Sequence, residues 1–314
     1  MNGVSLPVEF KLHNYRFENI AEKYYPIVKA ALEKLGHTEW NSSPDDLSDG
    51  WSSWPEIHVY NHCHESELST DTNNIILKPT GPTAKHFALD DIGYANSSSL
   101  AFKEPCELRK EYTNNSYDDK IKYLIECKAN KWDDSIILKW EDKLRKNFPK
   151  DHILVICQQP KDETVHGFGF GNHWSKICHI VDKLKQYRFP VVVKLHPSMK
   201  GKSQQIKAWE EQGIRVIKGY VSIHDVLCKT RVAIVDNSTA GIECMMHQVP
   251  IISYGFPEYH WATKQLQSLT QLEDLIYDLK WHDADYAWKF INWYINDYLC
   301  TDIDSTVKRL KQLI

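Results

Sequence analysis

The chain has 314 residues and a mass of 36.7 kDa, which is too long for one small domain and suits one large or two medium α/β domains. Hydrophobic residues make up 42% and charged residues 25%, a composition that excludes a disordered or fibrous protein. The 38 basic and 42 acidic residues give a net charge of −4, so no basic excess indicates a nucleic-acid-binding surface.

Three features of the sequence bear on its compartment. The longest apolar runs are only as long as a strand, so we expect no membrane-spanning helix. The first residues, MNGVSLPVEFKLHNYRF, lack the charged-then-apolar order of a signal peptide. The eight cysteines are scattered without CxxC pairs, which favours reduced thiols over a disulfide framework. We therefore expect a cytoplasmic protein with at most peripheral contact with a membrane.

The first half of the chain has an irregular pattern. Apolar residues at helical spacing predict helices, β-type runs predict short strands, and stretches rich in Ser, Asp, Pro, Gly and Asn predict loops. In chain order we expect a helix over 20–35, a loop over 40–54, strands at 57–60 and 75–77, a loop over 78–99, and a helical segment over 117–147 with a break near 131–134.

From residue 153 onward, short strands rich in Val and Ile alternate with short helices. This alternation predicts a parallel sheet covered on both faces, with ligands beyond the carboxyl ends of its strands. The change of pattern predicts a domain boundary near 148–151, with domains of residues 1–149 and 150–314 and the option that the last helix packs back on the first domain. The expected strands are 153–157, 191–195, 214–217, 232–235 and 251–254, and the expected helices are 173–187, 204–212, 222–228, 239–247 and 281–299.

The strand VVVKLHP is the first candidate for a binding site. Lys194 and His196 lie at its carboxyl end, where Pro197 ends the strand, and Lys200 follows in a basic loop. Cations at the end of a parallel strand are suited to holding an anion. The alternative is a surface loop with ordinary lysines.

The second candidate is the segment RVAIVDNSTAGIE, in which a buried strand meets a helix. Asn237, Ser238 and Thr239 offer a helix cap and backbone amides that bind phosphate, followed by Gly241. Glu243 follows in the first turns of the helix, where it could reach a ribose. A simple capping box is the alternative, and both interpretations are compatible. Together with VVVKLHP, this segment predicts a nucleotide site.

The third candidate is ILVICQQPKD, a buried strand followed by polar residues. It brings Gln158, Gln159 and Asp162 to the same carboxyl edge, one βαβ unit before His196. A carboxylate there could act as a nucleophile or a base, or could only stabilise its loop.

Two weaker patterns do not support a site. The segment GFGFG (167–171) is not a dinucleotide fingerprint, because no third glycine follows at the right offset into a helix. Four adjacent ligands in HCHE (62–65) cannot surround a zinc ion without distant partners, and no DxD motif precedes an apolar strand. We therefore expect no metal ion and no resident cofactor.

The ordered motifs Q-x-P-x-D, K-L-H-P and N-S-T-x-G-x-E, followed by a V-P-I-I strand, resemble those of the capsule-synthesis family of glycosyltransferases. Within it, the resemblance is to the retaining β-Kdo transferases of the KpsC and WbbB type, and it covers about residues 78–259. It implies a GT-B-like α/β fold of two Rossmann-like domains facing across a cleft. The N-terminal domain would lie on the acceptor side, and the C-terminal domain would bind the CMP-sugar.

The resemblance also implies roles for individual residues. Asp162 matches a nucleophile that attacks the anomeric carbon, and His196 matches the residue that meets donor phosphate and sugar. Ser238 and Thr239 match the phosphate-binding turn, and Glu243 matches the acid of the following helix. Lys194 is a cation that could pair the Kdo carboxylate.

The N-terminal segment FALDDIGYANSS resembles the family's acidic-x-x-Gly loop, which faces the acceptor. Asp90 stands where the family pattern has Glu, so the acid/base is either Asp90 or Asp91.

The resemblance therefore implies transfer of Kdo from CMP-Kdo to a saccharide acceptor in capsule or lipopolysaccharide synthesis, with retention through an Asp-linked intermediate. The acceptor would be an oligosaccharide or glycolipid, and peripheral contact with the inner membrane or with other assembly enzymes is expected. The alternatives are another CMP-sugar transferase of the sialyl type, a sugar-nucleotide epimerase on the same fold, and a non-catalytic sugar-binding protein.

Overall fold

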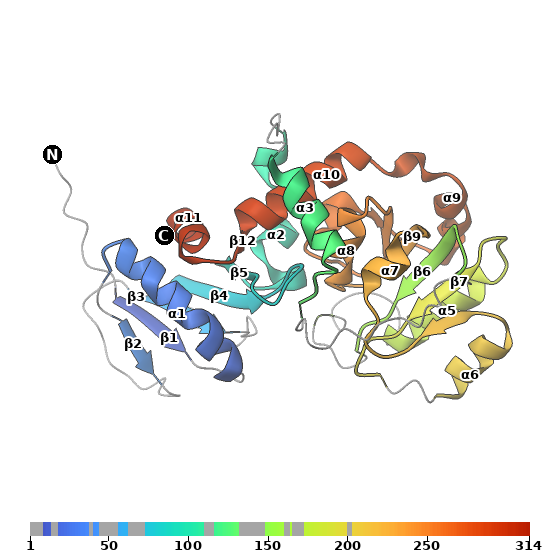
Figure 1. The fold of residues 1–314 in the computed structure, drawn as a ribbon, viewed down its shortest axis with the longest axis horizontal. Helices are drawn as coiled ribbons and strands as arrows, with labels where there is room; N and C mark the ends of the chain where they lie inside the picture. Colours follow the sequence, from blue (N-terminus) through green and yellow to red (C-terminus); the bar gives the residue numbers. More distant parts are fainter. Residues whose placement is uncertain are drawn as a thin grey trace. The chain divides into compact units, whose positions relative to one another are not determined.

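The structure is a computed structural model of the chain, and it describes residues 9–13, 18–37, 40–43, 56–61, 73–109, 116–131, 148–159, 164, 173–199 and 203–314. The chain forms two compact units (Figure 1). The first unit combines the two ends of the chain, Met1–Lys103 and Trp293–Ile314, and the second is the continuous segment Glu104–Asn292. The second unit is thus inserted into the first.

The first unit contains a six-stranded sheet with the order β12-β5-β4-β3-β1-β2. Strands β1 to β4 pair in parallel, whereas β5 runs antiparallel to both β4 and β12. Its elements are β1 (Glu9–His13), α1 (Glu18–Lys34), β2 (Trp40–Ser43), β3 (Glu56–Asn61), β4 (Asn73–Pro79), β5 (Phe87–Asp90), the 3-10 turn η2 (Ala95–Ser97), α2 (Ser99–Phe102), the π-helix η9 (Tyr294–Tyr298), β12 (Leu299–Cys300) and α11 (Ile303–Leu313).

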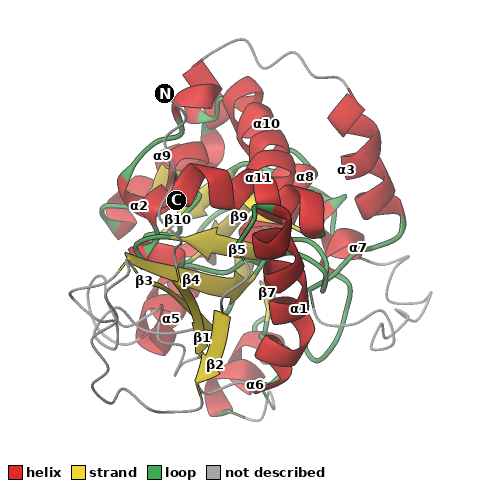
Figure 2. Ribbon diagram, turned by 90° about the vertical axis from the view of Figure 1, so that its left-hand side faces the viewer, coloured by secondary structure: helices red, strands yellow, loops and turns green. Residues whose placement is uncertain are grey.

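Helices α1 and α11 lie side by side and share one hydrophobic core with the first sheet (Figure 2). Val28 and Leu32 of α1, Leu77 of β4 and Leu310 of α11 are fully buried in this core. Each such side chain contributes roughly 1.5–3 kcal/mol relative to an exposed one. Asp302 is the N-cap of α11 and forms a capping box with Ser305. The Asp302 carboxylate accepts a hydrogen bond from the Ser305 amide, and the Ser305 hydroxyl accepts one from the Asp302 amide.

The second unit contains a fully parallel six-stranded sheet with the order β11-β10-β9-β6-β7-β8. Its elements are η3 (Cys106–Arg109), α3 (Ser116–Glu126), β6 (His152–Ile156), α5 (His173–Leu184), β7 (Val191–Lys194), α6 (Gln204–Glu211), β8 (Arg215–Ile217), α7 (Ile223–Leu227), β9 (Thr230–Val235), α8 (Ala240–Met246), β10 (Ile251–Ser253), η6 (His260–Ala262), β11 (Lys264–Gln265), η7 (Leu269–Gln271), α9 (Leu272–Tyr277), η8 (Leu279–Trp281) and α10 (Ala284–Trp293), which crosses back into the first unit.

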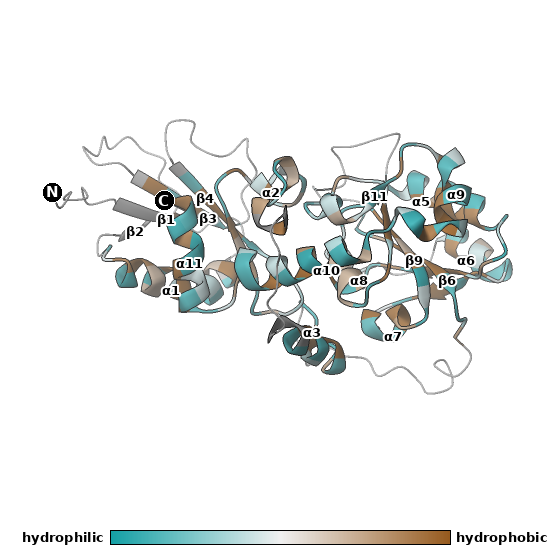
Figure 3. Cartoon of the chain, turned by 90° about the horizontal axis from the view of Figure 1, so that it is seen from above, coloured by the Kyte–Doolittle hydropathy of each residue, from teal (hydrophilic) through white to brown (hydrophobic). Residues whose placement is uncertain are grey.

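The central strands of the second sheet are apolar along their whole length, as a sheet covered on both faces requires. Every residue of β6 and β7 is buried, and β6 and β9 are drawn largely in the hydrophobic colours of Figure 3. Trp209 of α6, fully buried, packs against the ring of Trp174 on α5 at 5.5 Å. The predicted α/β fold with Rossmann-like domains is confirmed: the second sheet is fully parallel, and the first is parallel from β1 to β4 with antiparallel pairing at β5.

The structure divides the chain at other residues than the expected domains of 1–149 and 150–314. The units meet at Lys103 and Glu104, and again at Asn292 and Trp293. Residues 148–151 instead lie directly before β6, inside the second unit. The change of sequence pattern there marks the start of the second sheet, whereas α3 already belongs to the second unit.

Four predicted elements differ from the observed ones. The loop expected over 78–99 contains strand β5. Residues 40–43 were expected in a loop but form β2, which pairs with β1. The helix expected over 281–299 is split into η8, α10, η9 and β12. Of the helical segment expected over 117–147, α3 accounts for the first part, and residues 132–147 lie outside the described residues. Across the described part of the chain, no helix combines the length and apolarity needed to cross a membrane.

Candidate functional site

A pocket opens beyond the carboxyl ends of β6, β7, β8 and β9, the position that parallel sheets favour for ligands. Its cavity volume is about 130 Å³, below the several hundred Å³ of a site that encloses a whole drug-sized ligand. It could enclose only part of a nucleotide, such as a phosphate with the sugar beside it. All its lining residues belong to the second unit: 128–131, 156–157, 194–197, 220–224, 238–240 and Glu243.

Lys194 and Glu243 bring opposite charges to this pocket, although only 7% and 6% of their surfaces are exposed. Burial lowers the pKa of Lys194 to about 8, a shift that nearby Glu243 opposes. Burial likewise raises the pKa of Glu243 to about 7, against a backbone hydrogen bond and the charges of Lys131 and Lys194. Oε2 of Glu243 and Oγ of Ser222 are buried without a hydrogen-bond partner among the described residues. Such buried polar atoms, lining a cavity, are suited to a polar ligand.

His196 is oriented by a short chain of hydrogen bonds. Its Nδ1 accepts from the Ser198 amide at 3.3 Å and from the Ser198 hydroxyl at 2.7 Å, and that hydroxyl in turn accepts from Nε2 of Gln159. Because Nδ1 is the acceptor, the neutral ring carries its proton on Nε2. His196 and Pro197 line the pocket, so the ring provides an N–H donor at its wall.

The turn after β9 supplies the opposite wall. Ser238 and Thr239 line the pocket, while the Ser238 hydroxyl accepts from the Ala240 amide at 3.3 Å. Gly241 packs against Tyr259 instead: a Cβ atom there would lie 2.3 Å from the tyrosine oxygen. The Tyr259 hydroxyl also donates to the Ser238 carbonyl. Gly241 therefore fixes the turn rather than lining the site.

Gln158 and Asn237, both expected to bind substrate, are turned into the protein behind the pocket. Oε1 of Gln158 accepts from the Asn237 amide at 2.6 Å, and Nδ2 of Asn237 donates to the Thr164 carbonyl. The amide of Gln158 donates to Nε2 of His173 at 3.1 Å, and Nδ1 of His173 donates to Asp236 at 2.9 Å. His173 could not be identified from the sequence, because its partners are 15 and 63 positions away and no local pattern connects them.

The segment after α3 forms a third wall, which no sequence pattern predicted. Lys128 forms an ion pair with Asp225 at 2.8 Å, and Nε2 of His224 donates to the Ala129 carbonyl at 2.9 Å. Nδ1 of His224 therefore accepts from Nε2 of His247 at 2.8 Å. Burial lowers the pKa of His247 to about 4 and also lowers that of His224, so both rings are neutral near pH 7. These contacts place residues 128–131 beside α7.

Several expected positions lie outside the described residues. They are Asp162 and Lys200, the glycines of 167–171, and the HCHE segment 62–65. Within the described ranges, no group of three His, Cys, Asp or Glu residues is placed to hold a metal ion.

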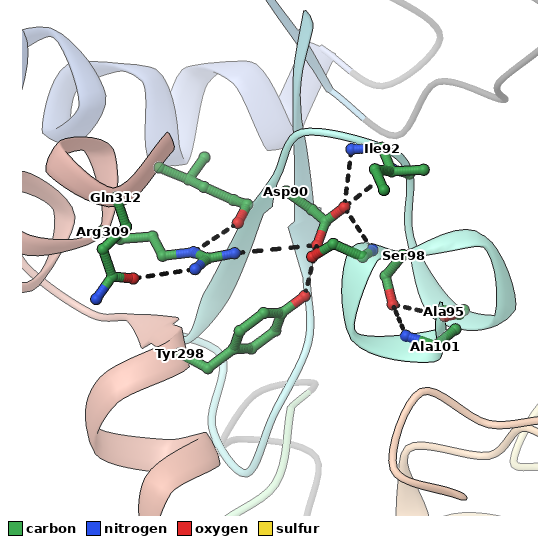
Figure 4. Close-up of polar contacts among 11 residues, drawn as sticks. Asp90, Ile92, Ala95, Ser98, Ala101, Tyr298, Arg309 and Gln312 are labelled. Carbon is green, nitrogen blue, oxygen red and sulfur yellow. Dashed lines mark hydrogen bonds and ion pairs between the residues drawn. The ribbon is translucent and has the colours of Figure 1, made fainter. Parts of the chain in front are cut away.

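Asp90, one of the two acid/base candidates, belongs to the first unit and is saturated with hydrogen bonds (Figure 4). Its Oδ1 accepts from the amides of Ile92, Gly93 and Ser99 at 2.9–3.0 Å. Its Oδ2 accepts from the Ser99 hydroxyl at 2.5 Å and the Tyr298 hydroxyl at 3.0 Å. Only 1% of Asp90 is exposed, whereas Asp91 is exposed. The geometry gives Asp90 a structural task and leaves Asp91 as the accessible carboxylate.

Comparisons with known proteins bear on the fold and the family. The chain is similar to two structures from Thermosulfurimonas dismutans. One is described as KpsC, beta Kdo 2,7 transferase, with 13% identity, a TM-score of 0.55, and 97% of this chain and 99% of that chain covered. The other is described as KpsC, beta Kdo 2,4 transferase, with 14% identity, a TM-score of 0.56, and 90% and 89% covered. At these identities the likeness establishes a shared GT-B-like fold.

No curated protein matches the chain. The family model described as "Capsule polysaccharide biosynthesis protein" matches residues 106–287, which is more than half of the chain and includes every residue that lines the pocket. The protein belongs to the capsule polysaccharide biosynthesis family.

Proposed function

We propose that this protein is a retaining glycosyltransferase that moves Kdo from CMP-Kdo to a saccharide acceptor in capsule or lipopolysaccharide synthesis. The observation that carries the proposal is the pocket of the second unit, where buried Lys194 and Glu243 lie with His196 beyond the ends of parallel strands. Two structures with the same fold are described as β-Kdo transferases, which supports this donor sugar.

The chemistry of CMP-Kdo suits these side chains. Kdo is a ketose with a carboxylate beside its anomeric carbon, and CMP adds one phosphate, so the donor carries two anionic groups. In our proposal, Nε2–H of His196 and the hydroxyls of Ser238 and Thr239 donate to the phosphate, and Lys194 supplies the cation that balances the donor's charge. Glu243 accepts from a ribose hydroxyl through its unpartnered Oε2.

The proposed reaction is a double displacement. The carboxylate of Asp162 attacks the anomeric carbon of Kdo, and the bond to the phosphate oxygen breaks with its electron pair, which releases CMP. An acceptor hydroxyl then attacks the same carbon, loses its proton to a base and frees Asp162. Two inversions give retention. The role of Asp162 rests on the resemblance of its QQPKD motif.

The acid/base of the second step is proposed to be Asp91. Asp90 was the alternative, but both of its carboxylate oxygens accept hydrogen bonds from its own loop and from Tyr298. A base must be able to reach the acceptor proton, and of the two only Asp91 is exposed.

The proposal includes no metal ion, because a leaving group with a single phosphate can be stabilised by hydrogen-bond donors and a lysine. It places the enzyme at the cytoplasmic face of the inner membrane, in peripheral contact with its glycolipid acceptor or with other assembly enzymes.

The first experiment compares nucleotides by thermal unfolding. CMP at a hundred times its dissociation constant should stabilise the protein by about 2.7 kcal/mol, whereas UDP at the same concentration should leave the melting temperature unchanged. Stabilisation by UDP but not by CMP would contradict the proposed donor class and would favour a UDP-sugar enzyme.

The second experiment tests the nucleophile. Incubation with CMP-Kdo and no acceptor should add one Kdo to the protein, carried on the peptide that contains Asp162. Asp162→Asn should abolish the adduct and the transfer while CMP still binds. The matched control is Asp151→Asn, a change at an exposed carboxylate in the same unit. Free epimerised sugar without acceptor, or an active Asp162→Asn enzyme, would defeat the mechanism.

A further inference from the structure

Behind the pocket lies a buried ionisable pair that the proposed chemistry does not use. His173 begins α5 and Asp236 follows β9, and their side chains are 1% and 2% exposed. Nδ1 of His173 lies 2.9 Å from Oδ2 of Asp236. Neither residue lines the pocket, so neither is placed to touch a ligand there.

The hydrogen bonds of this pair fix the proton on the imidazole. The backbone N–H of Gln158 can only donate a hydrogen bond, and it donates to Nε2 of His173 at 3.1 Å. Nε2 is therefore the acceptor, and the neutral ring carries its proton on Nδ1, where it donates to Asp236. In this tautomer one ring joins the end of β9 to the backbone that follows β6.

The connection continues on both sides of Gln158 to residues that line the pocket. The Gln158 side chain accepts from the Asn237 amide at 2.6 Å, directly before Ser238. The next residue, Gln159, donates to Ser198, whose hydroxyl donates to Nδ1 of His196 at 2.7 Å. The buried pair thus connects to His196 by one route and to Ser238 and Thr239 by the other.

Two neighbouring residues, Gly255 and Tyr254, pack directly against this pair. A Cβ atom at Gly255 would lie 1.8 Å from Oδ1 of Asp236, so only glycine leaves room for the carboxylate. The ring of Tyr254 stacks on His173, with centroids 6.1 Å apart. A buried hydrogen-bonded pair adds little net stability, because its polar groups give up hydrogen bonds to water when they are buried. Its value here is geometric, because it sets the spacing of two strand ends.

We propose that His173, held by Asp236, is a positioning residue that sets the placement of His196 and of the Ser238–Thr239 turn relative to each other. The assignment of these groups to donor binding rests on the proposed function, but the tautomer and the protection of the linked amides do not. His173 acts through Gln158 and has no contact with the donor.

The first test reads the tautomer and the linked amides in the full chain. In NMR spectra, His173 should be protonated on Nδ1 and not on Nε2. His173→Phe keeps a ring against Tyr254 but removes both hydrogen bonds. It should speed hydrogen exchange of the Gln158 and Asn237 amides at least tenfold, with little change in β7 or β10. The matched control is His152→Phe, which removes a buried histidine at the other end of β6 and should leave both amides protected.

The second test separates positioning from stability. At a temperature where both are folded, His173→Phe should lower kcat for transfer at least tenfold, since a displacement of 1 Å can cost a hundredfold. It should also weaken CMP binding, because the groups that His173 positions donate to the phosphate in the proposed function. Gln158→Leu should reproduce the loss of kcat, and the double variant should be no worse than either single one. His152→Phe should retain kcat.

The outcomes distinguish the two proposals. If the wild type does not bind CMP, the proposed donor is wrong. The tautomer and the hydrogen-exchange rates then still test the positioning role of His173 by themselves. Protonation on Nε2, or unchanged exchange at Gln158 and Asn237 in His173→Phe, would overturn the positioning role. Faster hydrogen exchange throughout the second unit, with kcat unaffected, would show that His173 is an ordinary core residue. That result would overturn the positioning role as well.

Discussion

Lys194 and Glu243 are two buried groups whose charges change close to neutral pH. The pKa of Lys194 is lowered to about 8 and that of Glu243 is raised to about 7, in both cases chiefly by burial. As the pH rises from 6 to 9, the pocket gains the negative charge of Glu243 and then loses the positive charge of Lys194. An anionic ligand is therefore favoured at the lower pH.

The first prediction concerns the pH dependence of CMP binding. The affinity of the wild type for CMP should fall at least tenfold between pH 6 and pH 9, measured by isothermal titration calorimetry. Lys194→Met should bind CMP at least tenfold more weakly at pH 7 and should show no further loss above pH 8. Lys207→Met removes an exposed lysine of α6 in the same unit and should behave as wild type. CMP binding that does not depend on pH would contradict a role for the Lys194 charge.

The second prediction concerns the stability cost of the buried Glu243 carboxylate. Its folded pKa of about 7 exceeds the ordinary value of 4.5, so between these pH values the folded protein holds a proton that the unfolded chain has released. The stabilisation from this proton is complete below pH 4.5 and is lost as the pH rises through 7. Glu243→Gln does not titrate, so its free energy of unfolding relative to wild type should rise from pH 5 to pH 8, by on the order of 2–3 kcal/mol.

Urea unfolding at the two pH values measures this difference. Glu211→Gln, at an exposed position of α6, is the control and should change the free energy of unfolding equally at both. An equal shift at pH 5 and pH 8 in Glu243→Gln would show that the carboxyl is not protonated in the folded state near pH 6.

At the scale of elements, Asp90 connects three of them. It ends β5, caps the loop that leads into α2, and accepts from Tyr298 at the end of η9 (Figure 4). Arg309 of α11 approaches its Oδ2 at 4.0 Å and donates to the Leu89 carbonyl. The carboxylate thus ties the C-terminal segment to the sheet.

The third prediction follows from this saturation. Asp90→Ala leaves three backbone amides and two hydroxyls without their acceptor and should lower the free energy of unfolding by about 3 kcal/mol or more. Asp91→Ala changes an exposed neighbour and should lower it by less than about 0.5 kcal/mol. Denaturant unfolding measures both. Transfer assays on the same variants should show the opposite order of specific activity, with Asp91→Ala the more impaired. A fully active Asp91→Ala enzyme would rule out Asp91 as the base.

The second sheet was predictable from sequence because its strands are buried on both faces. An uninterrupted apolar run such as Val191–Val193 between helical segments strongly favours a buried strand. Five of the six observed strands differ from the predicted ones by at most two residues at either end, whereas the two-residue edge strand β11 was not predicted. The first sheet was harder to predict from the sequence. Strand β2 has the sequence WNSS, which carries no β-type pattern, and it is a strand only because β1 lies beside it.

The site was predictable in part, for a similar reason. Lys194, His196 and Ser238 follow recognisable strands, so topology alone brings them to one edge. The roles of Asp90 and His173 could not be inferred from the residues next to them in the sequence. Their tasks depend on partners such as Tyr298, 208 positions from Asp90, and Asp236, 63 positions from His173.

At the scale of the whole molecule, the domain boundary illustrates the same limit. The pattern changes near residue 150, but α3 belongs with the second unit because Lys128 pairs with Asp225 and the Ala129 carbonyl accepts from His224. These contacts span about a hundred positions, so no local signal could place the boundary at Lys103.

The fourth prediction uses this division. Because every residue lining the pocket lies in Glu104–Asn292, a fragment of residues 104–292 should bind CMP within threefold of the affinity of the full chain. The same fragment should be inactive in transfer, since it lacks Asp91. Calorimetry and a transfer assay check the two statements. A folded fragment without affinity for CMP would show that the first unit contributes to nucleotide binding.

The insertion of one unit into the other gives the chain two covalent connections where a tandem arrangement would have one. A protease that cuts only at Lys103–Glu104 leaves both pieces attached through Asn292–Trp293, and the reverse holds for a cut at the second connection. The first unit is itself completed by Trp293–Ile314, whose α11 lies against α1. During synthesis on the ribosome, the second unit can therefore finish folding while the first still waits for its last helix.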